Sequence, residues 1–339
     1  MTPYIAETNI PLQISRCAAN KSVLITGDSG SGKTVAMRKM ARERSRKGQK
    51  VLVFNYGGTH EEILADRENY NVIKVREEGV PIPFLECFSS PYGGSEEDAD
   101  VCEAVAEVFS QINRMGYVAQ SYFEEACQRA IQMRETCDDD MRCLYKAVLL
   151  LEEGNKILIP KYRNLLTRIK FHKNFDLWRE GKVTVLDFSG YPYQTQLFLT
   201  QLILSVIWRY YRIFGQQMEG ETTLVLDEFQ NLPLREGAVL TQILREGRKF
   251  HLSLLLATQT LFTFDAAKRI ILQQPATKIY FRPVEIELKR ISKHFPDLKP
   301  ADAERLLQGL GIGECLANGV FDVAGSARYR TLKVSFWED

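Results

Sequence analysis

The chain has 339 residues, of which 45% are hydrophobic and 26% are charged, and its formal net charge is +1. This composition argues against a disordered or fibrous chain, and the length suffices for two domains or for one large α/β unit with an insertion. The net charge alone indicates no partner, because partners depend on where the charges lie.

Cysteine usage and hydropathy exclude further classes of protein. The seven cysteines include no Cys-x-x-Cys pair and the four histidines are scattered, so neither a disulfide framework nor a zinc site is expected. The first twenty residues lack the apolar stretch of a signal peptide. The most apolar segment, 197–214, contains Gln201, Arg209 and Arg212 and is predicted to be a buried helix rather than a membrane span. We therefore expect a soluble protein of the cytoplasm with reduced thiols.

Short apolar, β-branched segments recur along the chain, and each is followed by a helical pattern. Segments that are apolar on both faces are typical of strands in a mostly parallel sheet with helices on each side. The predicted strands of this kind are 22–26, 50–55, 182–188, 222–226 and 252–258. Two later segments, 277–281 and 328–336, alternate in polarity and fit edge strands.

The alternation of strand and helix stops between the second and third of these strands. From about 95 to 178 the chain reads as successive helices, predicted at 96–115, 119–134, 140–153 and 161–168. This stretch is too long for a loop, so we predict an inserted all-helical subdomain. Its charge is uneven, since 95–153 has 14 acids and 5 bases whereas 154–180 has 2 acids and 7 bases. Solvated helix faces and a docking surface for a partner both fit this pattern.

A phosphate-binding pattern, G-x-x-x-x-G-K-[ST], occurs near the N-terminus. It is matched by Gly27-Asp28-Ser29-Gly30-Ser31-Gly32-Lys33-Thr34. The strand 22–26 precedes it and a helix-forming segment, 35–47, follows it, which is the context that a phosphate loop requires. Glycines let backbone N–H groups turn toward a polyphosphate, and the helix N-terminus adds a favourable dipole. Lys33 is expected to neutralise the β- and γ-phosphate oxygens, and the Thr34 hydroxyl to ligate Mg²⁺.

Two acidic residues, Asp227 and Glu228, directly follow the apolar strand 222–226. Burial of such a carboxylate pair costs on the order of several kcal/mol unless a cation or a water network compensates it. Asp227 is therefore expected to hold Mg²⁺ through its water shell. Glu228 is the candidate base that orients and polarises the attacking water.

A third buried strand, 252–258, also ends in a polar residue, Gln259. An amide at this place can hydrogen-bond both a γ-phosphate and the attacking water, and so report whether the phosphate is present. The alternative is that Gln259 merely caps the turn that follows the strand.

Basic residues cluster just before that strand, in Arg245-Glu246-Gly247-Arg248-Lys249-Phe250. They can form a solvated helix end. In a ring of motor subunits the same segment can present an arginine to a neighbour's nucleotide, where its guanidinium stabilises the charge that develops on the γ-phosphate. We favour Arg248 for this role, with Arg245 and Arg282 as rivals.

Three segments, 27–34, 226–232 and 245–259, together resemble the HerA/FtsK superfamily of P-loop motors. Within it the chain is most similar to type IV secretion and conjugative coupling ATPases and to HerA-like DNA translocases. The resemblance implies an α/β fold with a RecA-like P-loop NTPase core, and ATP and Mg²⁺ as nucleotide and cofactor. It also implies a homo-oligomeric ring, usually a hexamer, with hydrolysis by Glu228, sensing by Gln259 and an arginine finger that acts in trans.

The resemblance also implies a division of the chain into three parts. Residues 1–94 would form the first part of the ATPase core, which holds the Walker A motif, and 181–339 the second part, which holds Walker B. Residues 95–180 resemble the all-helical domain of secretion and coupling ATPases. The sequence shows no N-terminal β-barrel, no transmembrane helix and no C-terminal DNA-reading module of the kind found in some relatives. The interpretation therefore includes a protein partner that supplies an N-terminal or effector module.

Positive charge is concentrated around the phosphate-binding pattern, with nine bases and two acids in 21–50. Six of the bases lie on the predicted helix 35–47: Arg38, Lys39, Arg42, Arg44, Arg46 and Lys47. Such a stripe can neutralise nucleic-acid phosphates, or it can be a solvated helix face. The absence of a helix-turn-helix, an RNA-binding aromatic motif or a zinc finger argues against sequence-specific recognition. Analogy with the family favours non-specific DNA binding.

The leading hypothesis is an ATPase that works as a ring motor and translocates DNA in conjugation, mobile-element transfer or defence. The alternatives are a secretion-system ATPase that moves protein cargo, and an ATP-gated scaffold that activates a partner effector such as a nuclease. The expected location is the cytoplasm, either free or at the periphery of a membrane secretion complex.

Overall fold

The computed structural model describes residues 4–5, 13–15, 18, 20–57, 61–92, 94–112, 115–323 and 326–336. The chain divides into two compact units. The first contains Met1–Val53, Glu180–Val183 and Glu219–Asp339, and the second contains Phe54–Arg179 and Thr184–Met218. Of the seven cysteines, Cys17 lies outside the described residues, and the other six form no disulfide among the residues described.

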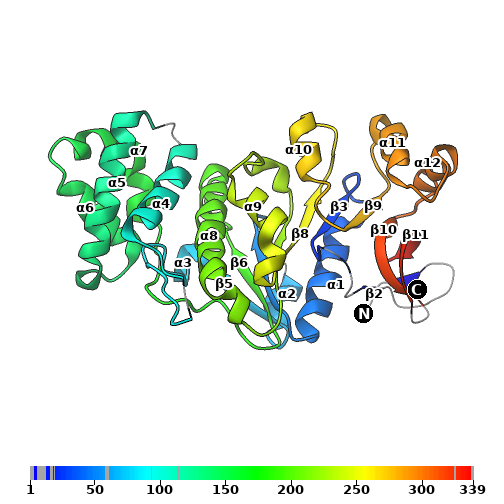
Figure 1. Cartoon of the computed structure of the whole chain (residues 1–339), viewed down its shortest axis with the longest axis horizontal. Helices are drawn as coiled ribbons and strands as arrows, with labels where there is room; N and C mark the ends of the chain where they lie inside the picture. Colours follow the sequence, from blue (N-terminus) through cyan, green and yellow to red (C-terminus); the bar gives the residue numbers. More distant parts are fainter. Residues whose placement is uncertain are drawn as a thin grey trace. The chain divides into compact units, whose positions relative to one another are not determined.

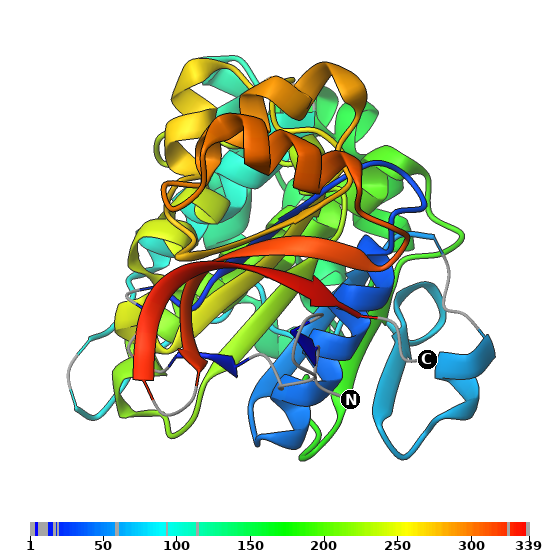
Figure 2. The ribbon, with the colours of Figure 1, turned by 90° about the vertical axis from the view of Figure 1, so that its right-hand side faces the viewer.

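The first unit is built on a sheet whose strands lie in the order β1-β11-β10-β9-β3-β8-β7-β4. The central pairs β3/β8, β3/β9 and β7/β8 are parallel, whereas β10 pairs antiparallel with both β9 and β11. The strands are β1 (Tyr4–Ile5), β2 (Gln13–Ile14), β3 (Val23–Thr26), β4 (Lys50–Asn55), β7 (Thr222–Leu226), β8 (Leu252–Thr258), β9 (Thr277–Phe281), β10 (Glu314–Val323) and β11 (Ser326–Ser335). Figure 2 shows β10 and β11 as a long, twisted pair.

Most predicted strands of this unit are confirmed, but the expectation of edge strands is wrong for 277–281. β9 lies between β3 and β10, and four of its five residues are buried. β10 was not predicted, because Asn318, Gly319 and Asp322 interrupt its apolar pattern. Gly319 lies so close to β9 that an added Cβ would be 3.0 Å from the Thr277 hydroxyl. The antiparallel strand that covers β9 therefore depends on a packing constraint that the local sequence does not reveal.

The first helix of this unit packs apolar residues against the sheet. In α1 (Lys33–Arg46), Ala36, Met37, Met40 and Ala41 recur at helical spacing and are buried, and the helix contacts β7 and β8. The remaining helices are α9 (Val239–Glu246), α10 (Ala266–Ile271), α11 (Glu285–Ile291) and α12 (Pro300–Gln308), with short 3₁₀ turns η3 (Phe229–Asn231), η4 (Gly247–Phe250) and η5 (Ser292–His294).

The second unit contains the predicted run of helices, which Figure 1 shows as a cluster. Its elements are α2 (Glu61–Ala65), β5 (Tyr70–Lys74), α3 (Val75–Glu78), α4 (Asp98–Ile112), α5 (Tyr117–Gln132), η1 (Arg134–Thr136), α6 (Asp140–Leu149), α7 (Gly154–Arg168), β6 (Val183–Asp187), α8 (Tyr193–Phe214) and η2 (Gly215–Gln217). No helix among the described residues has the length and apolarity needed to span a bilayer. The three-part division of the chain predicted from sequence stays a prediction.

Two elements of this unit differ from the sequence prediction. α7 begins at Gly154 and continues through Pro160, because buried Leu158 and Tyr162 hold the turns on both sides of the proline in place. β5 was not predicted, since only two of its five residues are buried and it lacks a continuous apolar pattern. The predicted buried helix at 197–214 is confirmed as the larger part of α8.

Aromatic rings join the helices of the second unit. The ring of Phe109 in α4 lies 4.6 Å from that of Phe123 in α5, 5.4 Å from that of Tyr162 in α7 and 4.8 Å from that of Phe198 in α8. All four side chains are fully buried. Since aromatic pairs contribute about 0.5–1.5 kcal/mol each beyond their buried area, these pairs stabilise the packing of α4 against α5, α7 and α8.

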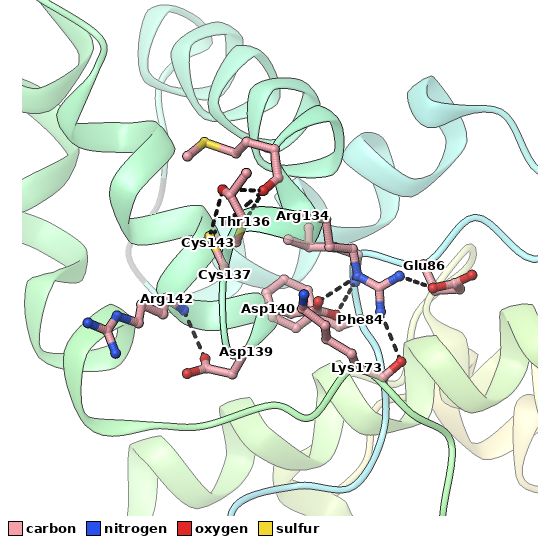
Figure 3. Close-up of polar contacts among 12 residues, drawn as sticks. Phe84, Glu86, Arg134, Thr136, Cys137, Asp139, Asp140, Arg142, Cys143 and Lys173 are labelled. Carbon is pink, nitrogen blue, oxygen red and sulfur yellow. Dashed lines mark hydrogen bonds and ion pairs between the residues drawn. The ribbon is translucent and has the colours of Figure 1, made fainter.

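A buried ion-pair network also holds the second unit together (Figure 3). Asp140 is completely buried, and its carboxylate accepts the Leu85 N–H at 3.0 Å and the Arg134 Nε–H at 2.7 Å. The Arg134 guanidinium also pairs with Glu86 and donates to the Lys173 carbonyl at 3.0 Å. Burial raises the pKa of Asp140, and the charge of Arg134 opposes this shift. The network thus links η1 and α6 to chain segments far away in the sequence.

Candidate nucleotide-binding site

The glycine-rich loop 27–34 connects β3 to α1, as the sequence predicts. Gly27 and Gly32 have φ of 155° and 109°, values that other residues rarely adopt. A Cβ on Gly27 would lie 2.5 Å from the Phe281 Cβ, and one on Gly32 would lie 3.0 Å from the Gly313 Cα. Glycine is therefore required at both positions for conformation and for space.

Two neighbouring segments of the first unit hold the outer part of this loop. The Asp28 N–H donates to the Arg282 carbonyl at 2.8 Å, and the Gly313 N–H donates to the Ser31 carbonyl at 2.9 Å. Arg282 directly follows β9, and Gly313 directly precedes β10. Ser29 and Gly30 lie at the exposed tip, where the backbone is accessible to a ligand.

Lys33 folds into the loop and is almost completely buried, with 6% of its surface exposed. Its ammonium donates to the carbonyls of Gly27 and Asp28 at 2.9 and 2.8 Å. Burial lowers the pKa of Lys33, while the charges of Asp227, Glu228 and Asp28 oppose the shift. Among the described residues Lys33 has no ion-pair partner within 4.0 Å, and phosphate oxygens would be stronger acceptors than the two carbonyls.

The two predicted metal ligands lie together. The Thr34 hydroxyl donates to the Asp227 carboxylate at 3.2 Å, which joins the start of α1 to the end of β7. Burial raises the pKa of Asp227, and the charge of Glu228 adds to this shift, whereas the Glu228 N–H, Thr34 and Lys33 oppose it. A hydroxyl and one carboxylate are ligands that Mg²⁺ uses when it also binds substrate phosphates. The described residues contain no group of three His, Cys, Asp or Glu side chains that would hold a metal alone.

Glu228 occupies a sharp turn between β7 and η3. Its φ of 50° is in the left-handed region, which costs about 1–2 kcal/mol for a residue other than glycine. Its backbone N–H donates to Asp227 at 2.9 Å, and its two carboxylate oxygens accept the side-chain amides of Gln259, at 2.8 Å, and Gln230. The strained turn thus aims the carboxylate at the end of β8, where Gln259 begins the next loop.

Gln259 therefore lies beside the candidate base instead of capping its own turn. Its role in sensing the γ-phosphate stays a prediction. The sequence analysis does not identify Gln230, which stands two residues after Glu228 in the polar segment that follows the strand. A polar side chain at that spacing, on the same short turn, was the signal that could have identified it.

The three candidate arginine fingers differ in their surroundings. Arg248 lies in η4, is exposed, and its side chain forms no hydrogen bond or ion pair among the described residues. Arg245 is also exposed but pairs with Glu236. Arg282 is exposed and lies beside the phosphate-binding loop of its own chain. The choice of Arg248 stays a prediction.

The basic stripe on α1 is partly used inside the first unit. Arg44 donates to the side chains of Thr223 and Ser253 at 2.8 and 3.3 Å, and burial lowers its pKa to about 10. Lys39 donates to the Phe336 carbonyl, and Lys47 pairs with a glutamate on its own helix. Arg42 also has an interaction within the chain, so at least four of the six basic residues are engaged, which reduces the stripe available to nucleic acid.

Comparison with known proteins gives one family match and several structural matches. The family model described as "Helicase HerA, central domain" matches residues 4–207. VirB4 of Thermoanaerobacter pseudethanolicus is similar with a TM-score of 0.67 at 17% identity, over 93% of this chain and 89% of that chain. The plasmid coupling protein TrwB in complex with ADP and Mg²⁺ is similar with a TM-score of 0.64 at 14% identity, over 99% of this chain and 89% of that chain. No curated protein matches the chain.

Identities this low establish the fold alone. VirB4 and TrwB are RecA-like P-loop ATPases, and the predicted fold class, a RecA-like P-loop NTPase core with a mostly parallel central sheet and inserted helices, is confirmed. The predicted resemblance to HerA/FtsK-type ATPases related to type IV secretion is confirmed as well.

Proposed function

Since the chain belongs to the family of the HerA helicase central domain, we propose that it is an ATP-hydrolysing motor that assembles into a ring and translocates DNA. TrwB, which shares its fold, has been seen with ADP and Mg²⁺ and with a non-hydrolysable ATP analogue. Conjugation, mobile-element transfer and defence are the contexts that we propose for it.

One observation carries this proposal: the hydrogen bond between Thr34 and Asp227 joins the phosphate-binding loop to the acidic pair. Side chains 193 positions apart in sequence thereby form one site with buried Lys33 at its centre. A simple glycine-rich turn would need neither the buried ammonium nor the facing carboxylates.

Each side chain of this site has a definite part in the proposed reaction. Backbone N–H groups of the loop and the Lys33 ammonium bind the β- and γ-phosphates. Thr34 would hold Mg²⁺ directly and Asp227 through its water shell, and the ion would neutralise charge on the phosphate oxygens. Glu228 orients the attacking water and accepts its proton, and Gln259 contacts the γ-phosphate and the water. Arg248 of a neighbouring subunit stabilises the charge that develops on the γ-phosphate.

The first test is ATP turnover by the purified protein and by Glu228→Gln, with and without duplex or single-stranded DNA. The substitution keeps the shape of the side chain but removes the base, so turnover falls on the order of 10²- to 10³-fold while Mg·ATP binding persists. Glu219→Gln, at an exposed position, is the matched control and keeps wild-type turnover. Wild-type hydrolysis by Glu228→Gln would remove Glu228 from the role of base.

The DNA arm of the same assay tests the cargo. Stimulation of turnover by DNA supports translocation of nucleic acid. Turnover that DNA leaves unchanged supports the secretion alternative, in which the cargo is protein, or the scaffold alternative, in which an effector co-purifies in a fixed ratio. Electron microscopy with an ATP analogue and duplex DNA shows whether a ring forms and whether DNA passes through it.

A further inference from the structure

The loop that connects β8 to α10 begins with Gln259, so its conformation determines where that side chain points. At its start, the Thr258 hydroxyl donates to the Thr260 carbonyl at 3.1 Å. At its end, the ring of Phe264 stacks on that of Phe229, which directly follows Glu228, with centroids 5.8 Å apart and an interplanar angle of 12°. The loop is therefore packed against the turn that carries the candidate base.

The middle of this loop is held by a carboxylate from a different element. Glu287 in α11 is buried, with 4% of its surface exposed. Its two oxygens accept the backbone N–H groups of Leu261, at 3.2 Å, and of Phe262, at 2.8 Å. A buried carboxylate is costly unless hydrogen bonds compensate it, and here two adjacent N–H groups do so. The match is specific for a carboxylate, because a side-chain amide offers only one acceptor oxygen.

α11 contacts the same loop a second time. The Arg290 guanidinium, one turn after Glu287, lies over the ring of Phe262 at 5.2 Å from its centroid. The helix thus contacts both the backbone and a side chain of the segment that follows Gln259. Positions three apart lie on one face of a helix, so a shift of α11 would move both contacts together.

We propose that Glu287 is a positioning residue for hydrolysis: it fixes the loop at Leu261 and Phe262 so that Gln259 reaches Glu228. The chain of contacts runs from the Glu287 carboxylate through two backbone N–H groups to Gln259, and from its amide to the Glu228 oxygen at 2.8 Å. Glu287 touches no substrate in this scheme. The inference rests on the proposed function, because it concerns the base of ATP hydrolysis.

Steady-state ATP turnover by Glu287→Gln tests the proposal. The amide keeps the volume of the side chain but loses one acceptor and directs its NH₂ group at a backbone N–H. We expect kcat to fall about tenfold, which corresponds to about 1.4 kcal/mol, while KM for ATP stays within about twofold. Glu285→Gln, the same change at an exposed position on the same helix, is the control and leaves kcat unchanged.

A double-mutant cycle with Gln259→Ala separates positioning from general structural support. If Glu287 acts through Gln259, adding Glu287→Gln to Gln259→Ala lowers kcat by less than about twofold. A further tenfold loss in the double variant would mean that Glu287 acts elsewhere and would overturn the proposal. So would an unchanged kcat in folded Glu287→Gln.

Glu287→Asp keeps the test decisive if Glu287→Gln does not fold. Aspartate retains two acceptor oxygens on a shorter side chain, so we expect a loss of only about threefold in kcat, and again almost none in the Gln259→Ala background. A loss equal in both backgrounds contradicts the proposal. Turnover by the wild type distinguishes the two claims, since a wild type without ATPase activity refutes the proposed function and this inference with it.

Discussion

Two buried aspartates, one in each unit, differ in the partners of their carboxylates. Burial raises the pKa of both Asp140 and Asp227. In the helical unit, Asp140 forms an ion pair with Arg134 at 2.7 Å. At the candidate site, the Asp227 carboxylate accepts a hydroxyl, at 3.2 Å, and a backbone N–H, at 2.9 Å, and has no further hydrogen-bond donor within the described part of the chain. Asp140 thus has a cationic partner inside the fold, whereas Asp227 has none within ion-pair distance among the residues described.

Arginines of the two units differ in the same way. The Arg134 side chain is 12% exposed and bonds to two carboxylates and a carbonyl. Arg209 in α8 is similarly buried and pairs with Glu96 at 2.7 Å. Arg248 is exposed and has no side-chain partner among the described residues. Charges that hold the fold are paired internally, and charges proposed for function are left for a ligand or a neighbouring subunit.

The largest effect is expected for the unpaired arginine. Arg248→Ala should lower ATP turnover on the order of 10³-fold and leave Mg·ATP binding and the melting temperature nearly unchanged, because the side chain is proposed to act only on a neighbour's transition state. Rings that contain both Arg248→Ala and Glu228→Gln subunits should recover part of the activity, because some sites with an intact Glu228 then face a neighbour with an intact Arg248. Normal turnover by Arg248→Ala would transfer the role to Arg245 or Arg282.

For the internally paired Arg134 we expect the opposite, a loss of stability rather than a specific loss of turnover. Arg134→Met leaves Asp140 and Glu86 without their cation and should destabilise the helical unit by about 3–5 kcal/mol, or roughly 10 °C in Tm. Arg142→Gln is the control, since Arg142 pairs with Asp138 on the surface and should cost less than about 1 kcal/mol. Equal shifts in thermal unfolding for both variants would remove the contrast between buried and exposed pairs.

The smallest expected effect is a pair of Tm shifts of opposite sign when Asp227 and Asp140 are each replaced by asparagine. The pKa of Asp227 is raised in the folded state above its ordinary value of 3.8. The free energy of unfolding therefore falls as the pH rises from 3.8 through the pKa that Asp227 has in the folded protein. Asp227→Asn removes this loss and should raise Tm at neutral pH by about 2 °C. Asp140→Asn should lower Tm, because both Asp140 oxygens accept N–H donors and the amide would direct its NH₂ group at one of them. Melting curves from pH 4 to 8 test this, and shifts of the same sign would contradict the comparison.

The sequence predicts the parts of the site that are local in the chain. Gly27 to Thr34, and the acids after 222–226, can be recognised because each lies at the end of a strand with a definite apolar pattern. Glu287 and Gly313 carry no such signal, since they contact residues that only the tertiary fold brings near, whereas the contact of Gln230 with Glu228 lies within one short turn. β5 and β10 also lack a clear local pattern. Few residues of β5 are buried, and glycine and polar residues interrupt the apolar pattern of β10.

By itself, the sequence determined the α/β class, the helical run and the phosphate-binding loop, because periodicity and motif spacing are encoded within a few turns or strands. Only the tertiary structure decided that β9 is an interior strand, that Arg44 is turned inward, and that Glu287 holds the loop next to Gln259. These features depend on which strands become neighbours and on where burial makes an unpaired polar group costly. The interaction energies involved arise between residues distant in sequence, so they cannot be predicted from the local sequence pattern.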